Sequence, residues 1–322
     1  MSEKDNATKN FMEKDENFAD AFNFLVFDGK PVIKPENLTS IDSAILGFPD
    51  GFGRKSSSIK KYRDVVKYLS VKRDENASYI LLAIENQSKT HYAMPVRNMM
   101  YDAIQYEKQI RDLEDIHKKR KSKMSSSEYL SGFTKTDRLK PVVTLVINFS
   151  NEPWDGPVSL NEMIESDNEA YLKFIPDYRI NLIDPFTMTS DDFKKFSSHL
   201  KEILLYLKCS RNKEELKQLL QTEKVYEHTP NEVVGLINIL TGSNIKIDET
   251  AEETNMCQAL QGLLHDSRIE GEKEGRKEGT LSAFYEMIKQ GLITIDQAAT
   301  SLGITTKQLL DNFKEYNLTL EK

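Results

Sequence analysis

An apolar run that ends in two polar side chains constrains the fold of this chain most. The run is Tyr79-Ile-Leu-Leu-Ala-Ile-Glu85-Asn-Gln87, and its length and composition predict a buried β-strand. Because side chains alternate along a strand, Glu85 and Gln87 point to one face of the sheet and Asn86 to the other. A sheet with at least one covered face is therefore expected near residue 85.

The polar segment 71–77 precedes this strand and predicts a hairpin between residues 62–70 and residues 78–87. Asp64 and Glu85 then lie far from the turn on facing strands, where their side chains can converge. Carboxylates are natural ligands for Mg²⁺, which neutralises a phosphodiester and activates a water for its hydrolysis. The spacing indicates a nuclease site, although acids at strand ends also commonly face solvent.

Gln87 departs from the usual form of such a site. Lysine is the usual residue at this position, and its charge stabilises the attacking hydroxide or the phosphate. Glutamine offers hydrogen bonds but no charge. The sequence leaves open whether activity persists at a lower rate or another cation takes the place of the lysine.

A set of motifs recurs in order along most of the chain. The set comprises Phe18-Ala-Asp-Ala-Phe-Asn23, Phe27-Asp-Gly-Lys-Pro-Val-Ile33, Tyr62-Arg-Asp64, Ile84-Glu-Asn-Gln-Ser88, Met94-Pro-Val-Arg97, Tyr101-Asp-Ala103, Leu139-Lys-Pro-Val-Val-Thr-Leu-Val146, Pro153-Trp-Asp-Gly-Pro157, Ile175-Pro-Asp-Tyr-Arg-Ile-Asn-Leu182 and Asn255-Met-Cys-Gln-Ala-Leu260. It resembles the PD-(D/E)XK nuclease family transposases of bacteria, also called the Rpn or recombination-promoting nuclease group. The ordered set is far more specific than any one motif.

The resemblance implies a restriction-endonuclease-like α/β core, a short mixed sheet flanked by helices, and metal-dependent DNA cleavage linked to recombination or mobile elements. It implies that Asp64 and Glu85 hold Mg²⁺, for which Mn²⁺ can substitute, and that Gln87 takes the lysine position, where glutamine is familiar in this family. Asp20 is the candidate for the acid that the first helix often adds. The alternative is a weak or inactive relative that acts as a DNA-binding or protein-regulating module. A true transposase is not favoured, because no basic end-binding domain is evident.

A long helix is predicted after the motif strand, with Pro95 in its first turn and apolar residues at steps of three and four from Met99 to Leu113. Its adjacent face carries Arg97, Tyr101 and Gln105. These three side chains either reach metal or phosphate, which a guanidinium suits well, or form a surface stripe with structural hydrogen bonds.

The remaining elements follow from the same periodicities. Residues 1–9 are expected to be frayed. A helix is predicted at 17–27, and strands are predicted at 141–149 and 175–183. One apolar helical stripe is predicted from Phe193 to Leu207. His117-Lys-Lys-Arg-Lys-Ser-Lys123 is the strongest basic cluster. It could contact the DNA backbone, but a solvated, mobile loop is the favoured interpretation.

Four parts are expected: a nuclease-like core at 1–190, a helical extension at 191–265, a Glu-Gly repeat at 266–280 and a helix-turn-helix-like appendage at 281–322. The repeat is either a helix with a glycine-lined side or, slightly favoured, a charged linker. The appendage has few basic residues on its second helix, so a protein-interaction or regulatory use is favoured over DNA reading.

Composition limits the function classes. The net charge is −7, so any DNA contact must come from a local basic surface. Two cysteines give neither a disulfide framework nor metal-ligand spacing, and both are expected to be buried thiols. No apolar segment matches a leader or a membrane span, which predicts a cytoplasmic protein without membrane contact. DNA is the expected partner, and a homodimer is raised only by analogy with nucleases of this fold that cut both strands.

Overall fold

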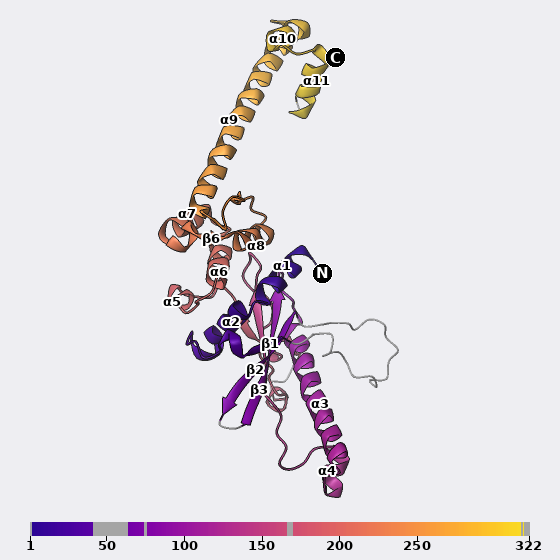
Figure 1. Ribbon diagram of the computed structural model, residues 1–322. Coiled ribbons are helices and arrows are strands. Elements are labelled where there is room, and N and C mark those ends of the chain that lie inside the picture. The colour runs from indigo at the N-terminus through magenta and orange to yellow at the C-terminus, as the bar shows by residue number, and fades with distance from the viewer. Residues whose placement is uncertain (1, 41–63, 74–75, 166–169, 317, 319–322) are drawn as a thin grey trace. The chain divides into compact units, whose positions relative to one another are not determined.

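The computed structural model describes residues 2–40, 64–73, 76–165, 170–316 and 318, with the backbone alone at 71–73, 76–79, 81 and 263–271. Figure 1 follows the elements along the chain. Two compact units are present, Met1–Met256 and Cys257–Lys322. The further divisions expected at residues 190, 265 and 280 stay predictions.

The first unit contains a five-stranded sheet with the order β1-β2-β3-β4-β5. Its strands are β1 (Leu38–Ser40), β2 (Val65–Arg73), β3 (Asn76–Gln87), β4 (Val142–Asn148) and β5 (Asn181–Ile183). The first three strands are antiparallel, and β3, β4 and β5 run parallel. This confirms the expected short mixed sheet. The strand expected at 175–183 is shorter, because Pro176 lacks an N–H for the ladder and residues 172–174 form a 3₁₀ turn, η4 (Leu172–Phe174).

Helices cover both faces of this sheet (Figure 1). On one face, the Lys67 ammonium of β2 lies 5.0 Å from the centroid of the Phe18 ring of α2 (Asp15–Phe27). On the other face, Tyr106 of α3 (Met94–Arg120) packs against Val66 and Ala83. Ala83 therefore points toward α3. Because side chains alternate along a strand, Glu85, two residues later, points to the same face.

The N-terminal residues are ordered, so the expectation of a frayed segment at 1–9 is wrong. Helix α1 (Glu3–Met12) begins at a capping box, in which Ser2 and Asp5 satisfy each other's backbone N–H groups. Its Thr8 and Phe11 are buried. Lys4 Nζ donates to the carbonyl of Leu240, 2.6 Å away, which fixes α1 on α8 (Asn231–Thr241).

The hairpin extends further than expected. β2 runs to Arg73 and β3 begins at Asn76, so most of the segment 71–77 is strand rather than turn. Residues 62 and 63, part of the expected first strand, lie outside the described residues. The helix expected at 17–27 and the strand expected at 141–149 are present as α2 and β4.

The apolar stripe from Phe193 to Leu207 is buried but interrupted. It belongs to two helices, α5 (Ser190–Phe193) and α6 (Leu200–Cys209). The other elements of this unit are η1 (Pro35–Asn37), α4 (Ser126–Ser131), η3 (Asn161–Met163), α7 (Lys213–Thr222), η5 (Lys224–Glu227) and a small sheet of β6 (Thr229–Pro230) and β7 (Glu253–Thr254).

The second unit is built from α9 (Met256–Lys289), α10 (Ile295–Leu302) and α11 (Thr306–Glu315). Its core consists of Leu281, Ala298, Ala299, Leu309 and Phe313. The capping boxes expected at Thr294 and Thr305 are both present. The Glu-Gly repeat lies within the helix α9 and is not a linker. A Cβ added at Gly275 or Gly279 would meet no atom within 4 Å, and Gly271 is described in its backbone alone.

Cys209 and Cys257 are half-buried rather than fully buried. Within the described part of the chain, no helix is long and apolar enough to cross a membrane.

Candidate nuclease site on the central sheet

The site is centred on the paired ends of β2 and β3. Val65 pairs with Ile84, so Asp64, one residue before β2, lies beside Glu85. The backbone N–H of Asn86 donates to Asp64 Oδ2 at 2.7 Å, which ties the two segments together. The geometric prediction that Asp64 and Glu85 converge across a hairpin therefore matches the structure.

Glu85 is the most deeply buried carboxylate of this site. Its side chain is 0% exposed, and Arg97 Nη2 lies 2.9 Å from Glu85 Oε2. Arg97 stands in the first turn of α3, where Pro95 occupies one of the first two positions without losing a helical hydrogen bond. Its guanidinium also lies over the ring of Tyr101, 5.6 Å from the centroid. Arg97 thus lies against Glu85, and Tyr101 lies against Arg97, rather than in an exposed surface stripe.

Electrostatics in the site follow from this burial. Burial is the largest single influence on the pKa of Arg97 and lowers it, but Glu85, Tyr101 and Asp64 together outweigh burial and raise the pKa of the guanidinium. The pKa of Asp64 is also raised, chiefly by burial. The hydrogen bond from the Asn86 N–H and the positive charges of Arg97 and Lys9 act against that shift, whereas the negative charge of Asp5 adds to it. The site therefore resists accumulating negative charge and favours a compensating cation.

Asp5 is a residue that sequence reasoning missed. Ser88 Oγ donates to Asp5 Oδ1 at 2.9 Å, next to the end of β3, and Asp5 acts electrostatically on Asp64. Hydrogen bonds from Ser2 and Ser88 outweigh partial burial and lower the pKa of Asp5. The Ser2-x-x-Asp5 capping box was the available signal, because it predicts that α1 is ordered.

Asp20, expected to complete the metal site, has a different role. Its buried carboxylate accepts hydrogen bonds from both the backbone N–H and the hydroxyl of Ser197 and of Ser198, at 2.7 to 3.1 Å. These bonds fix the turn between α5 and α6. Because the Asp20 carboxylate is engaged in that turn, it is not available as a metal ligand.

Gln87 on β3 and Gln105 on α3 have different surroundings. Gln87 is buried, and its Nε2 donates to the backbone carbonyl of Asn86 at 3.1 Å. Gln105 lies two helical turns beyond Arg97 on α3, where it lines a cavity of about 160 Å³ with Tyr68. Gln87 therefore stays next to the site, whereas Gln105 is assigned to a separate cavity.

Two asparagine side chains next to residues of the site are buried without hydrogen bonds. Asn86 follows Glu85, and Asn98 follows Arg97; both side chains are buried. None of the described residues forms a hydrogen bond with either side-chain amide. Buried polar groups without partners are rare and need an explanation, such as a ligand, water or ion.

The site has fewer carboxylates than a metal ion coordinated entirely by protein side chains would require. Among the described residues, no group of three or more His, Cys, Asp or Glu side chains is arranged to hold a metal ion. Mg²⁺ requires fewer protein ligands, because it retains several waters and takes one or two carboxylates.

Comparison with known proteins identifies the family. The family model described as "Putative transposase, YhgA-like" matches residues 57–233, more than half of the chain. A search of curated proteins finds no match, and a search of solved structures finds none. The five-stranded mixed sheet flanked by helices is compatible with a restriction-endonuclease-like core. The chain therefore belongs to the YhgA-like transposase family, within the PD-(D/E)XK/Rpn group.

Proposed function

We propose that this protein is a metal-dependent DNA endonuclease that hydrolyses phosphodiester bonds in connection with recombination or mobile elements. The observation that carries the proposal is the side-by-side position of Asp64 and Glu85 on paired strands. Family membership supports it, because the family is described as transposases, which act on DNA.

The donor set suits Mg²⁺, with Mn²⁺ as a substitute. Asp64 and Glu85 supply two carboxylates, the number that Mg²⁺ commonly takes from a protein. Burial raises the pKa of Asp64, so a bound cation would stabilise its charged form. When bound, the metal would neutralise the phosphate and activate a water.

The chain's own residues have distinct roles in this proposal. Asp64 and Glu85 would hold the metal, and Gln87 would orient the attacking water by hydrogen bonding. Arg97 balances the charge of Glu85 at 2.9 Å and, with Tyr101, forms the wall of the site toward α3. A guanidinium in this position can also bind a phosphate oxygen of the substrate.

The test is cleavage of supercoiled plasmid in Mg²⁺ or Mn²⁺ by the full chain. Asp64→Asn and Glu85→Gln remove one charge each with little change in shape. Asp191→Asn is the matched control, because Asp191 is an exposed acid on α5 whose only described ion pair joins it to the exposed Lys194. Cleavage lost in both site variants and kept in the control, with all three folded by circular dichroism, is the expected result.

Equal cleavage by all proteins would assign the activity to a contaminant and refute the proposal. Isothermal titration with Mn²⁺ provides a readout besides activity: binding should vanish in both site variants. The absence of both binding and cleavage in the unmodified protein would also refute it.

The second candidate function is a non-catalytic module that binds DNA or regulates a protein. Two observations favour it: Gln87 lacks the usual lysine charge, and its amide is engaged by its own strand. Duplex binding without metal binding would support this candidate.

A further inference from the structure

A concentrated positive charge lies at the far end of α3. Residues 117–140, named here the basic tip, comprise the end of α3, α4 and the segment leading toward β4. Their basic residues are Lys118, Lys119, Arg120, Lys121, Lys123, Lys135, Arg138 and Lys140, and their acids are Glu128 and Asp137. The formal charge is therefore 8 − 2 = +6, in a chain whose net charge is −7.

The basic cluster from His117 to Lys123 is only partly the loop favoured from sequence, because residues 117–120 belong to α3 and residues 121–125 connect it to α4. Helix α3 continues through Arg120 and ends at Lys121, whose N–H bonds to the carbonyls of His117 and Lys118. Gly132, at the end of α4, packs so closely on α3 that an added Cβ would lie 2.9 Å from Glu114 Cγ. Only glycine fits this approach, and its φ of +66° also favours glycine.

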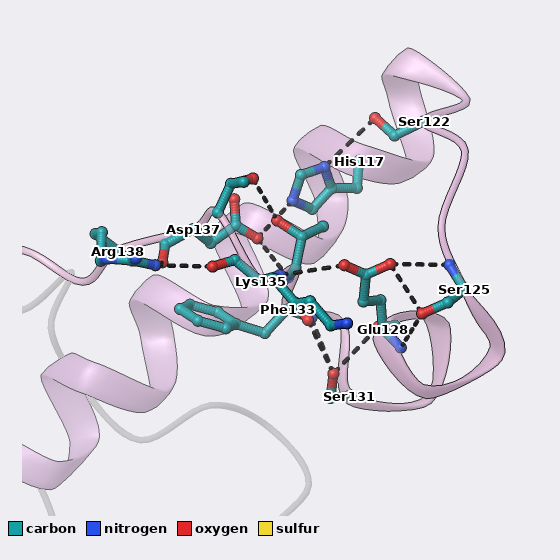
Figure 2. Close-up of polar contacts among 11 residues, drawn as sticks. His117, Ser122, Ser125, Glu128, Ser131, Phe133, Lys135, Asp137 and Arg138 are labelled. Carbon is teal, nitrogen blue, oxygen red and sulfur yellow. Dashed lines mark hydrogen bonds and ion pairs between the residues drawn. The ribbon is translucent and has the colours of Figure 1, made fainter.

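Both acids of the basic tip are used to hold it together, as Figure 2 shows. Glu128 accepts hydrogen bonds from the Ser125 N–H and hydroxyl and from the Lys135 N–H, at 2.9 to 3.1 Å. Asp137 Oδ2 lies 2.8 Å from His117 Nε2 and accepts from the Thr134 N–H at 2.7 Å. The carboxylates therefore secure the backbone rather than neutralise the basic side chains.

Four of the eight basic side chains are uncompensated. Lys119, Arg120, Lys121 and Lys123 are exposed, and in the described ranges no carboxylate lies within ion-pair distance of any of them. Lys118 is different, because it pairs with Glu114 one turn earlier. Exposed cations held on an ordered scaffold attract a polyanion and lose little freedom on binding it.

The length of α3 favours duplex DNA as that polyanion. From Arg97 to Arg120 the helix advances 23 residues, or about 35 Å at 1.5 Å per residue. One turn of B-DNA is about 34–36 Å long. A duplex whose backbone reaches the site at Asp64 and Glu85 would therefore present backbone again near the basic tip. The acids between them, such as Asp112 and Asp115, confine the contact to the two ends of the helix.

We propose that the basic tip binds the phosphate backbone of double-stranded DNA, about one helical turn from the cleavage site and without reading base sequence. The choice of substrate rests on the proposed function. The binding itself is measured without cleavage.

An anionic membrane is the competing occupant. Tyr129 and Leu130 of α4 are 74% and 89% exposed beside the basic residues, and such a combination also suits an anionic lipid surface. Membership in a transposase family favours DNA. Vesicles therefore enter the experiment as a separate arm.

The experiment compares three forms of the full chain in EDTA by anisotropy of a labelled duplex of about 30 base pairs, chosen to span several helical turns. The tip variant carries Lys119→Gln, Arg120→Gln and Lys123→Gln. The control variant carries Lys213→Gln, Lys217→Gln and Lys224→Gln, which remove the same charge from exposed positions on α7 and η5. A third form, with Lys119→Arg, Arg120→Lys and Lys123→Arg, keeps the charge.

The tip variant should bind about tenfold more weakly at low salt, and the slope of log Kd against log salt should fall by about 3. The control and charge-keeping forms should match the unmodified protein. Equal binding by tip and control variants would overturn the proposal. Anionic vesicles captured only through the basic tip, with duplex binding unchanged, would overturn it in favour of a membrane. Tip-dependent duplex binding by a protein that cleaves no DNA would uphold this inference and refute the nuclease.

Discussion

Replacing Arg97 with methionine tests whether it is the counter-ion of the buried Glu85. Methionine retains much of the side-chain volume but leaves a carboxylate of 0% exposure without the cation 2.9 Å away. We expect a large loss of stability in EDTA, which Mg²⁺ should partly restore, because a cation held by Asp64 and Glu85 would replace the lost charge.

The magnitude follows from the geometry. At 2.9 Å, Coulomb's law with an effective dielectric constant near 20 gives an attraction of about 6 kcal/mol. Arg97 is 21% exposed, so water screens part of this attraction. Breaking buried pairs generally costs about 3–5 kcal/mol, and we expect Arg97→Met to fall in that range. For a unit of this size, such a loss lowers Tm by about 10 °C.

The assay is urea denaturation followed by circular dichroism, with Arg111→Met as the control. Arg111 lies on the same helix, and its ion pair with Glu107 is largely exposed, so its loss should cost about 0.5 kcal/mol. In a Glu85→Gln background, Arg97→Met should cost less than it does alone. Equal costs for the two arginine substitutions would refute the argument that Glu85 depends on Arg97.

Three other outcomes are expected. Asp20→Ala leaves the donors of residues 197–198 without their acceptor, so it should cost about 3 kcal/mol in urea denaturation without abolishing cleavage by the folded protein; loss of cleavage at full stability would contradict this. A hydrogen bond from the Thr189 N–H lowers the pKa of Asp192 from 3.8 to about 2, so its stabilisation is present above pH 3.8 and disappears as the pH falls toward 2. The deficit of Asp192→Ala should shrink over that interval, and a constant deficit would be inconsistent with it. Gln87→Lys should speed plasmid cleavage about tenfold by restoring the missing charge, and no gain would argue against a catalytic position.

Local patterns predicted the elements that carry the site. Alternation along the strand predicted the shared face of Glu85 and Gln87, and the hairpin placed Asp64 opposite Glu85. Helical spacing from Met99 to Leu113 predicted α3, but it left open whether Arg97 reaches the site. These predictions succeed because strand and helix periodicities are properties of neighbouring residues.

Local patterns failed where a distant partner decided the outcome. Asp20 looked available for a metal, but residues 177 positions away in the sequence engage its carboxylate. The first nine residues looked frayed, but packing on α8 orders α1 and brings Asp5 to Ser88. The basic tip looked like a loop, but His117 and Glu128 bind the segment that follows α4.

The sequence by itself therefore determined the paired strands β2 and β3, the helix α3 and the pair of acids, because each depends on spacing along a short stretch of chain. Tertiary structure alone decided which charges compensate each other, which acid is structural and which basic residues remain uncompensated. The physical reason is that burial and pairing depend on segments brought together by the whole fold, and the free energy of a charge depends on those neighbours rather than on its place in the sequence.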